Sequence, residues 1–363
     1  MKGLMKGPVL HILIFLIVNV GFLMESRLSA QRNNRESGSV KAVVTDNVLM
    51  VIGSGGHGSK ELGGQSPYNS IPLEEQVKIM KYVGLGCERG WAEFDTVGVA
   101  KKYTQMWDYF YEHGIDNLAI LNPIPQVLRC TNATEAYAYG FTLGNEAAGV
   151  GKNHHVKYWD CGNEFGGIAR NKWPDDYDQR KLEKCIAMQK GLIDGIRAAD
   201  PNAKCMISDF RNIAYHKAAW DAGLRWDITG IHEYTPYTAE GFNDNSIIDP
   251  LNNKFPSNSL QYCNDHFNGL PIWITEFNEN GGQGTNDSTH AQFFKKALDR
   301  YKSVAETYNL QRIFIYEFYK QPGLVVYEAE AGIVKPDGKL TQAADSIKAW
   351  IKRNPPFLPK QNK

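Results

Sequence analysis

The sequence predicts an α/β protein built as a single (β/α)8 barrel, also called a TIM barrel. Short segments rich in apolar and β-branched residues alternate with longer amphipathic segments, and this strand–helix unit occurs eight times. Strands that alternate with helices of about ten residues or more imply parallel pairing through helical crossovers. Residues 118–121 and 313–315 are apolar throughout, as expected of strands covered on both faces. Eight such units fit a closed barrel better than an open doubly wound sheet.

The expected elements follow this alternation along the chain. Residues 178–200 form the most evident helix, which Pro201 closes. The helix expected over 99–114 ends at Gly114, a residue type that favours helix C-caps. The expected strands are 49–54, 84–91, 115–121, 155–164, 203–208, 226–234, 271–277 and 312–319. The expected helices are 74–83, 99–114, 133–149, 178–200, 214–223, 259–268, 291–308 and 342–353.

The first thirty residues differ from the rest of the chain. Lys2 and Lys6 give a basic start, residues 8–24 are almost unbroken apolar sequence, and Ala30 ends a small-residue exit. This pattern predicts a signal peptide over 1–30, a polar leader over 31–46 and the barrel domain over 47–363. The protein is therefore expected to be exported, to the periplasm or out of the cell. An uncleaved single-span anchor is the alternative, because the apolar run approaches the ~17 residues that cross a bilayer.

Charge and composition narrow the classes of partner. The chain has 40 Lys and Arg against 40 Asp and Glu, so its formal net charge is zero. A nucleic-acid binder needs a basic surplus to displace counterions. Because this chain has no such surplus, no nucleic-acid partner is expected. The hydrophobic content of 42% suffices for a sizeable core and argues against disorder. No membrane contact is expected of the mature form unless the N-terminal segment stays as an anchor, and the oligomeric state is left open.

The cysteine and glycine patterns predict neither a metal nor a cofactor. The six cysteines lack the close spacing of a zinc or redox motif, although an even count in an exported chain leaves disulfides open. Residues 53–58 have the sequence GSGGHG after an apolar run, which matches the first half of a dinucleotide fingerprint. That motif needs a helix beginning at the glycines, whereas helix-breaking residues continue to Pro72. A flexible loop at the barrel mouth is expected instead.

Two glutamates stand at the ends of expected strands. Glu164 ends the fourth strand, directly after Asn163, and Glu276 ends the seventh. In a (β/α)8 barrel the chemistry belongs at the C-terminal ends of the strands, and closure places these two ends on facing parts of the rim. Paired carboxylates across a cleft are what glycoside hydrolysis requires, because one protonates the leaving oxygen while the other attacks or activates water.

These strand ends resemble those of the clan A glycoside hydrolases, whose catalytic glutamates occupy the same two positions. Arg89 in GLGCERGW resembles the arginine that such enzymes place near the nucleophile. The segment IHEYTPY resembles their sixth strand, with His232 and Tyr234 facing the site. The resemblance implies a retaining O-glycoside hydrolase that cleaves oligo- or polysaccharides by double displacement.

The same resemblance implies a role for each residue. Glu276 would be the nucleophile and Glu164 the acid/base, with the two carboxyl groups ~5–5.5 Å apart, the retaining distance. Asn163 would hydrogen-bond the sugar hydroxyl next to the reacting carbon, and Tyr234 would orient Glu276.

The end of the eighth strand departs from the clan pattern. Many members have a Trp there as the floor of the sugar subsite, whereas this chain has IYEFYKQPG, with Tyr316 as a candidate substitute beside Phe318 and Tyr319. Glu317 could bind a sugar hydroxyl or pair with a neighbouring lysine. Two further aromatic residues past strand ends could stack on a sugar. They are Trp91 and Trp173.

Other interpretations stay open. Arg89 could be a structural ion-pair partner and His232 a core histidine. A non-catalytic glycan-binding protein could keep the barrel without the chemistry. A metal-dependent barrel hydrolase would need clustered ligands, and only His57 lies near the first strand. His154 and His155 precede strand four, at the opposite end of the barrel. The sugar is not fixed, although the GNE form is similar to β-xylosidase-like and α-L-arabinofuranosidase-like clan members.

Overall fold

The structure is a computed structural model, and it describes residues 50–62, 65–172, 175–210, 213–238, 241–242, 259–280, 287–324 and 329–355. The signal peptide predicted over 1–30 and the polar leader predicted over 31–46 lie outside these residues, so export stays a prediction. Among the described residues, no helix has both the length and the apolar character needed to cross a bilayer.

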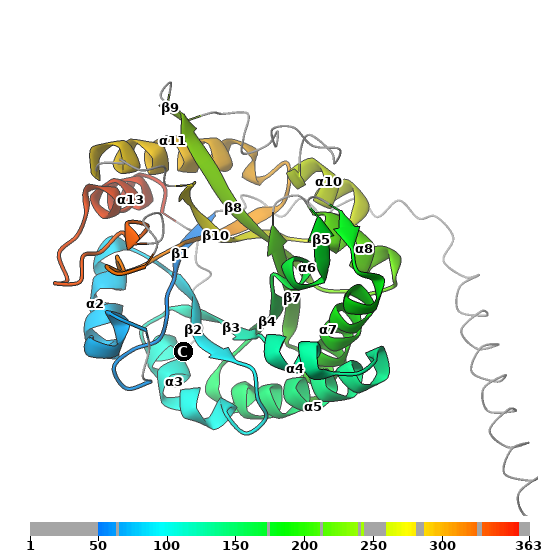
Figure 1. The fold of residues 1–363 in the computed structure, drawn as a ribbon. Helices are drawn as coiled ribbons and strands as arrows, with labels where there is room; N and C mark the ends of the chain where they lie inside the picture. Colours follow the sequence, from blue (N-terminus) through cyan, green and yellow to red (C-terminus); the bar gives the residue numbers. More distant parts are fainter. Residues whose placement is uncertain are drawn as a thin grey trace, which may run out of the picture. The chain divides into compact units, whose positions relative to one another are not determined.

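Eight parallel strands close into a barrel, which confirms the predicted fold class (Figure 1). Each strand pairs with the next along the chain, and the circle closes because the last of them pairs with the first. Every predicted strand overlaps one of the observed ones. The barrel strands are β1 (Val51–Gly55), β2 (Cys87–Phe94), β3 (Asp116–Leu121), β4 (Tyr158–Asn163), β7 (Lys204–Phe210), β8 (Ile228–Thr238), β10 (Ile272–Asn280) and β11 (Leu310–Ile315).

Helices surround the strands on the outside of the barrel (Figure 1). Each of the eight predicted helices overlaps an observed one. These are α2 (Leu73–Val83), α3 (Thr104–Glu112), α5 (Ala133–Gly151), α7 (Gln179–Ala199), α8 (Ala214–Asp221), α10 (Ser259–His266), α11 (Asp287–Ala305) and α13 (Gln342–Arg353).

Short elements that the sequence did not predict add to the loops. They are the 3-10 helices η1 (Tyr68–Ser70) and η3 (Lys152–His154), the helices α4 (Ile124–Arg129) and α6 (Phe165–Ala169), and the strands β5 (Arg170–Lys172), β6 (Asp176–Tyr177) and β9 (Gly241–Phe242). Of these, α6 matters for function because it begins directly after Glu164. The first turn of the helix predicted over 99–114 is the 3-10 helix η2 (Ala100–Tyr103).

Local capping explains where several helices begin and end. The Asn132 side chain accepts the backbone N–H of Glu135 at 2.9 Å, and Glu135 in turn accepts the N–H of Thr131 at 2.7 Å. The first bond satisfies an N–H group that the first turn of α5 leaves without a helical partner, and the second holds the residue before the N-cap. Helix α2 ends at Gly84, whose φ of 95° is the left-handed conformation that glycine adopts without strain.

Helices α5 and α7 pack unusually closely. A Cβ atom at Gly144 would collide with the carbonyl oxygen of Leu192, and one at Gly195 would collide with that of Phe141. Small residues four apart on both helices let the two backbones approach each other. Gly140 and Gly191 repeat the pattern one turn away, so glycine at these positions sets the distance between the two helices.

The core has two parts. The larger part lies between the strands and the helices, while a smaller cluster is formed by strand residues alone, including Trp273 and Phe314. Next to that cluster, the Arg312 guanidinium lies over the rings of Tyr158 and Trp273, at 4.7 and 4.4 Å from their centres, and pairs with Asp116 at 2.5 Å. Side chains therefore fill the barrel interior, as is typical of this fold.

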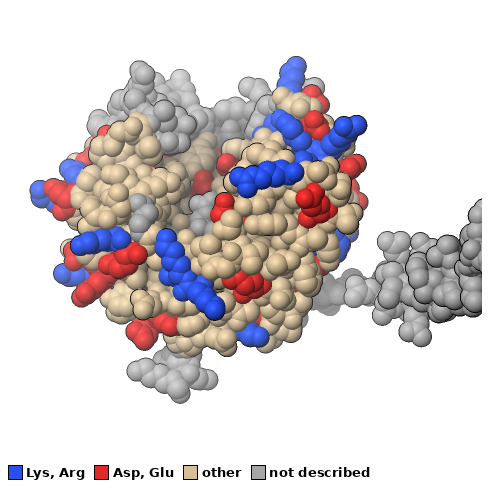
Figure 2. All heavy atoms as spheres, turned by 60° about the horizontal axis from the view of Figure 1, so that its bottom comes forward, with Lys and Arg blue, Asp and Glu red and all other residues tan. Residues whose placement is uncertain are grey.

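The cysteines and surface charges complete the description. All six cysteines are buried free thiols, so the disulfides that the sequence left open do not form in this structure. On the surface, Figure 2 shows Lys and Arg side chains mixed with Asp and Glu over the face that it displays.

Candidate active site

The side chains that the sequence singled out at strands two, four, six and seven converge at the C-terminal end of the barrel. Strand pairing begins this convergence, because Glu276 on β10 is in register with His232 on β8. Arg89 from β2 and Glu164 after β4 reach the same place from the other side of the barrel. Residues up to 187 positions apart thus share one hydrogen-bond network.

Glu276 is held at both carboxylate oxygens. Arg89 Nη1 donates to Oε1 at 2.9 Å, and the Tyr234 hydroxyl donates to Oε2. Burial would raise the pKa of Glu276, but the charges of His232 and Arg89 and the bonds from Tyr234 and Arg89 outweigh it, so its pKa lies below the ordinary value. Glu276 is therefore ionised at neutral pH.

Arg89 connects the nucleophile candidate to a second buried acid. Its Nε and Nη2 donate to Asp160 Oδ2 at 3.1 and 2.8 Å, and Nη2 also contacts Asn163 Oδ1 at 2.6 Å. Ser208 donates to the same Asp160 oxygen at 2.7 Å. Burial alone would lower the pKa of Arg89, but Asp160 and Glu276 raise it above its ordinary value. The structural ion pair considered for Arg89 therefore exists, and the same guanidinium also binds Glu276.

Glu164 has a different setting from Glu276. Its backbone is left-handed, with φ 52° and ψ 39°, a conformation that costs a non-glycine residue about 1 kcal/mol or more. Its Oε1 accepts a bond from His232 Nδ1 at 2.7 Å. The Glu164 side chain is 30% exposed, against 11% for Glu276. Glu164 thus has more access to solvent and fewer partners.

His232 lies between the two carboxylates. Its Nδ1 is 2.7 Å from Glu164 Oε1 and 3.5 Å from Glu276 Oε2, and the side chain is fully buried. Burial would lower the pKa of His232, but the charge of Glu276 and the hydrogen bond with Glu164 raise it above the ordinary value. The core-histidine interpretation is therefore incomplete, because this buried ring contacts both acids.

Tyr316 is the strand-eight aromatic residue that borders the site. Its ring meets that of Tyr234 edge-on, with centres 6.1 Å apart, and its hydroxyl lies 3.2 Å from His57 Nε2. Phe318 and Tyr319 are fully buried and cannot contact a sugar. Tyr316 is thus the candidate for the subsite floor.

Glu317 follows neither of the two alternatives considered for it. Its carboxylate is fully buried and accepts bonds from Tyr68 at 3.0 Å and from Gln321 at 2.5 Å. Lys320 pairs with Asp287 and Glu330 instead. The Oε2 atom of Glu317 also lies 3.6 Å from Nε2 of His57. Glu317 therefore helps to hold the loop that carries His57.

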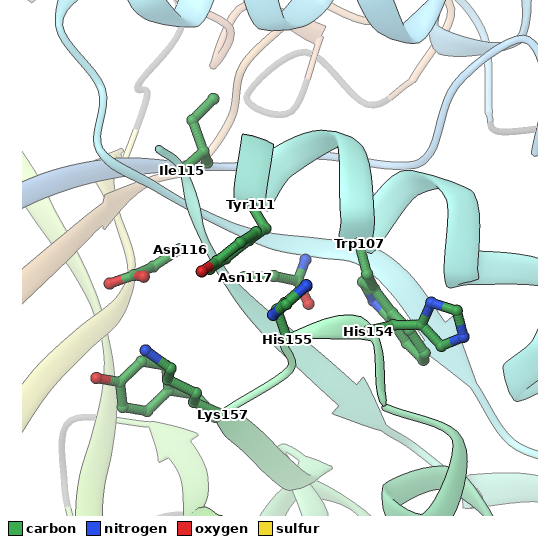
Figure 3. Close-up of a pocket in the computed structure, with 9 residues that line it drawn as sticks. Trp107, Tyr111, Ile115, Asp116, Asn117, His154, His155 and Lys157 are labelled. Atoms are coloured by element: carbon green, nitrogen blue, oxygen red, sulfur yellow. The ribbon is translucent and has the colours of Figure 1, made fainter. Parts of the chain in front are cut away.

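The two tryptophans proposed as stacking platforms cannot be placed. Trp91 belongs to β2, but its side chain lies outside the described residues, as does all of Trp173. His154 and His155 lie at the other end of the barrel, beside a hollow lined by the first residues of β3 and β4 (Figure 3). There His155 stacks on Tyr111 with ring centres 3.6 Å apart. Inside this hollow there is room for about one ordered water molecule.

Two other kinds of site can be tested against the geometry. Glu164, His232 and Glu276 each offer one ligand atom, and these atoms lie within 4.8 Å of one another, as a metal site would require. Arg89 and Tyr234 already occupy both Glu276 oxygens, so a cation would compete with a guanidinium. The glycine motif begins within β1 and continues into irregular backbone and a turn at residues 60–62, and the next described α-helix, α2, begins only at Leu73. It therefore lacks the helix that a dinucleotide site needs.

Sequence reasoning missed several members of this network. Asp160 and Ser208 lie inside otherwise apolar strands, and a polar residue inside a strand was the signal that could have found them. His57 was considered only as a metal ligand. Asp209, the next residue after Ser208 on β7, was missed as well.

Comparisons with known proteins match part of the chain to one family and its fold to several solved structures. Residues 215–346 match the family described as glycosyl hydrolase catalytic core. Among solved structures, the fold resembles a β-D-glucuronidase of Dictyoglomus thermophilum (14% identity, TM-score 0.59, 86% of this chain and 52% of that one). It also resembles a family 39 glycoside hydrolase of Bacteroides cellulosilyticus WH2 (14%, 0.61, 82% and 62%) and a family 1 β-glucosidase of Thermotoga maritima (13%, 0.61, 86% and 99%).

These likenesses concern the fold. The chain spans about half of the Dictyoglomus enzyme and less than two thirds of the Bacteroides enzyme. A search of curated proteins gives no significant match. The expected resemblance to clan A glycoside hydrolase barrels is confirmed at the level of the fold, and part of the chain matches a glycosyl hydrolase family model.

Proposed function

We propose that the protein is a retaining glycoside hydrolase in which Glu276 is the nucleophile and Glu164 the acid/base. One observation carries the proposal: an oxygen of each carboxylate lies within 4.8 Å of the other. Retaining enzymes hold these groups ~5–5.5 Å apart, whereas inverting enzymes need at least ~6.5 Å to admit a water molecule between them. A separation of at most 4.8 Å between these oxygens is on the retaining side of this division, so it supports direct attack by Glu276.

The surroundings of the two acids support opposite roles. A nucleophile must be ionised, and Glu276 has a lowered pKa beside Arg89 and His232. An acid/base must reach both the leaving group and the incoming water, and Glu164 is the more exposed of the two.

The reaction then proceeds in two displacements. A Glu276 oxygen bonds to the anomeric carbon while the bond to the leaving oxygen breaks, and Glu164 gives that oxygen its proton. Water next attacks the same carbon as Glu164 takes back a proton, and the Glu276 ester bond breaks. Two inversions return the starting configuration.

Other residues bind the sugar in this proposal. Arg89 fixes the Asn163 amide with its oxygen toward the guanidinium, which leaves Nδ2 to donate to the hydroxyl beside the reacting carbon. Tyr316 offers an aromatic face at the floor of the site. Two of the similar structures are a β-D-glucuronidase and a β-glucosidase, so the first substrates to test are aryl β-D-glucuronides and β-D-glucosides. Aryl β-xylosides and α-L-arabinofuranosides complete the panel.

The test uses the panel substrate that the enzyme cleaves fastest. Proton NMR of the first sugar released should show the anomer of the substrate, and Glu276→Ala should lose turnover while the protein stays folded. Release of the opposite anomer would remove the nucleophile role. Binding without turnover on every substrate would favour a non-catalytic glycan-binding protein. Loss of activity in EDTA that added Zn²⁺ restores would favour a metal-dependent hydrolase.

A further inference from the structure

We propose that Asp209 is a positioning residue that sets the direction of the Glu164 carboxyl group, an inference that rests on the proposed role of Glu164 as acid/base. Asp209 lies near the end of β7, the strand next to β4, and only 1% of it is exposed. It does not reach the cleft, so its effect passes through the backbone around Glu164.

The segment around Glu164 is fastened to β7 on both sides of that residue. The backbone N–H of Glu164 donates to the carbonyl oxygen of Ser208 at 3.0 Å. Two residues later, the backbone N–H of Gly166 donates to Asp209 Oδ2 at 2.5 Å. Adjacent residues of one strand thus hold the chain just before and just after the left-handed turn that presents Glu164.

Gly166 lies so close to Asp209 and Tyr215 that no side chain fits at this position. A Cβ atom there would lie 2.5 Å from Asp209 Oδ2 and 2.7 Å from the Cβ of Tyr215, both closer than real Cβ contacts. The other oxygen of Asp209 accepts the N–H of Phe210 at 2.7 Å. Both Asp209 oxygens therefore accept from backbone N–H groups, one in α6 and one at the end of β7 itself.

The charge of Asp209 suits this function. Burial and the nearby charge of Glu164 raise the pKa of Asp209 to about 6, although its two N–H bonds act to lower it. At neutral pH the carboxylate is ionised, so both oxygens accept. An asparagine has one oxygen and one NH₂ group, and would set a donor against one of the two N–H groups.

The experiment compares leaving groups on the panel sugar that the wild-type enzyme cleaves fastest. The phenol of a phenyl glycoside leaves only when Glu164 protonates its oxygen, whereas 2,4-dinitrophenolate leaves without protonation. Asp209→Asn should lower kcat/KM about tenfold or more on the phenyl glycoside and much less on the dinitrophenyl one. Azide, which attacks without a general base, should raise kcat of the variant on the dinitrophenyl glycoside. If Asp209→Asn does not fold, Gly166→Ala replaces it, because the added Cβ would displace Asp209 Oδ2. This variant should show the same difference between the two glycosides.

Two controls separate the possible failures. Asp227→Asn also removes a carboxylate that accepts a strand N–H, that of Cys205 at 2.9 Å, but at the other end of β7, and it should not change the dependence on leaving group. Glu164→Ala should show the largest dependence. If it shows none, the proposed role of Glu164 fails. If Glu164→Ala shows it while Asp209→Asn and Gly166→Ala lose activity equally on both glycosides, or lose none, the positioning role is wrong.

Discussion

The Tyr234 hydroxyl offers the sharpest test of how the site keeps Glu276 ionised. Tyr234→Phe removes the donor to Glu276 Oε2 and keeps the ring, which packs edge-on against Tyr316. The bond from Arg89 to the other oxygen stays in place. The substitution therefore changes one hydrogen bond to one charged group.

The expected size follows from that single bond. A hydrogen bond to a charged group is worth about 1.5–3 kcal/mol, and one pKa unit corresponds to about 1.4 kcal/mol. Because this bond lowers the pKa of Glu276, its loss should raise that pKa by about 1–2 units. The nucleophile must be ionised, so activity should disappear at a higher pH as the solution is acidified.

The measurement is the dependence of kcat/KM on pH, which reports groups of the free enzyme. The acidic limb of Tyr234→Phe should move upward by about 1–2 pH units. Tyr137→Phe is the matched control, because its hydroxyl also donates to a carboxylate, Asp194 at 3.0 Å, on the outer helices. An acidic limb that stays in place in Tyr234→Phe would show that this hydroxyl does not tune the nucleophile.

Two predictions concern stability. Gly144→Ala should destabilise the protein by about 1–3 kcal/mol because its Cβ collides with α7. A Cβ at Gly149 on the same helix meets no atom within 4 Å, so Gly149→Ala should be neutral or stabilising. Thermal unfolding of both variants checks this. Burial lowers the pKa of His216 to about 4, below its unfolded value of about 6.5, so the unfolded chain binds the proton first and stability should fall as pH drops from about 6.5 to 4. Urea unfolding across this range should show about 3 kcal/mol of loss from this group, and a shallower slope in His216→Gln; equal slopes would contradict the assignment.

The secondary structure could be predicted because its signals are local. The apolar runs that became β3 and β11, and the amphipathic stretch that became α7, are visible within windows of 6 to 21 residues. The elements that sequence reasoning missed, such as α6, are too short for a periodic pattern, and α6 exists because β7 holds the chain beside it.

The sequence by itself determined the number of strand–helix units, hence the barrel, and the placement of two glutamates at strand ends. It could not determine what surrounds them. Arg89 meets Asp160 across 71 positions and Glu276 across 187, and these contacts exist only because the strands close into a circle. Pairs formed by closure leave no periodic mark on the chain, so burial, hydrogen bonding and charge at the site were decided by the tertiary structure.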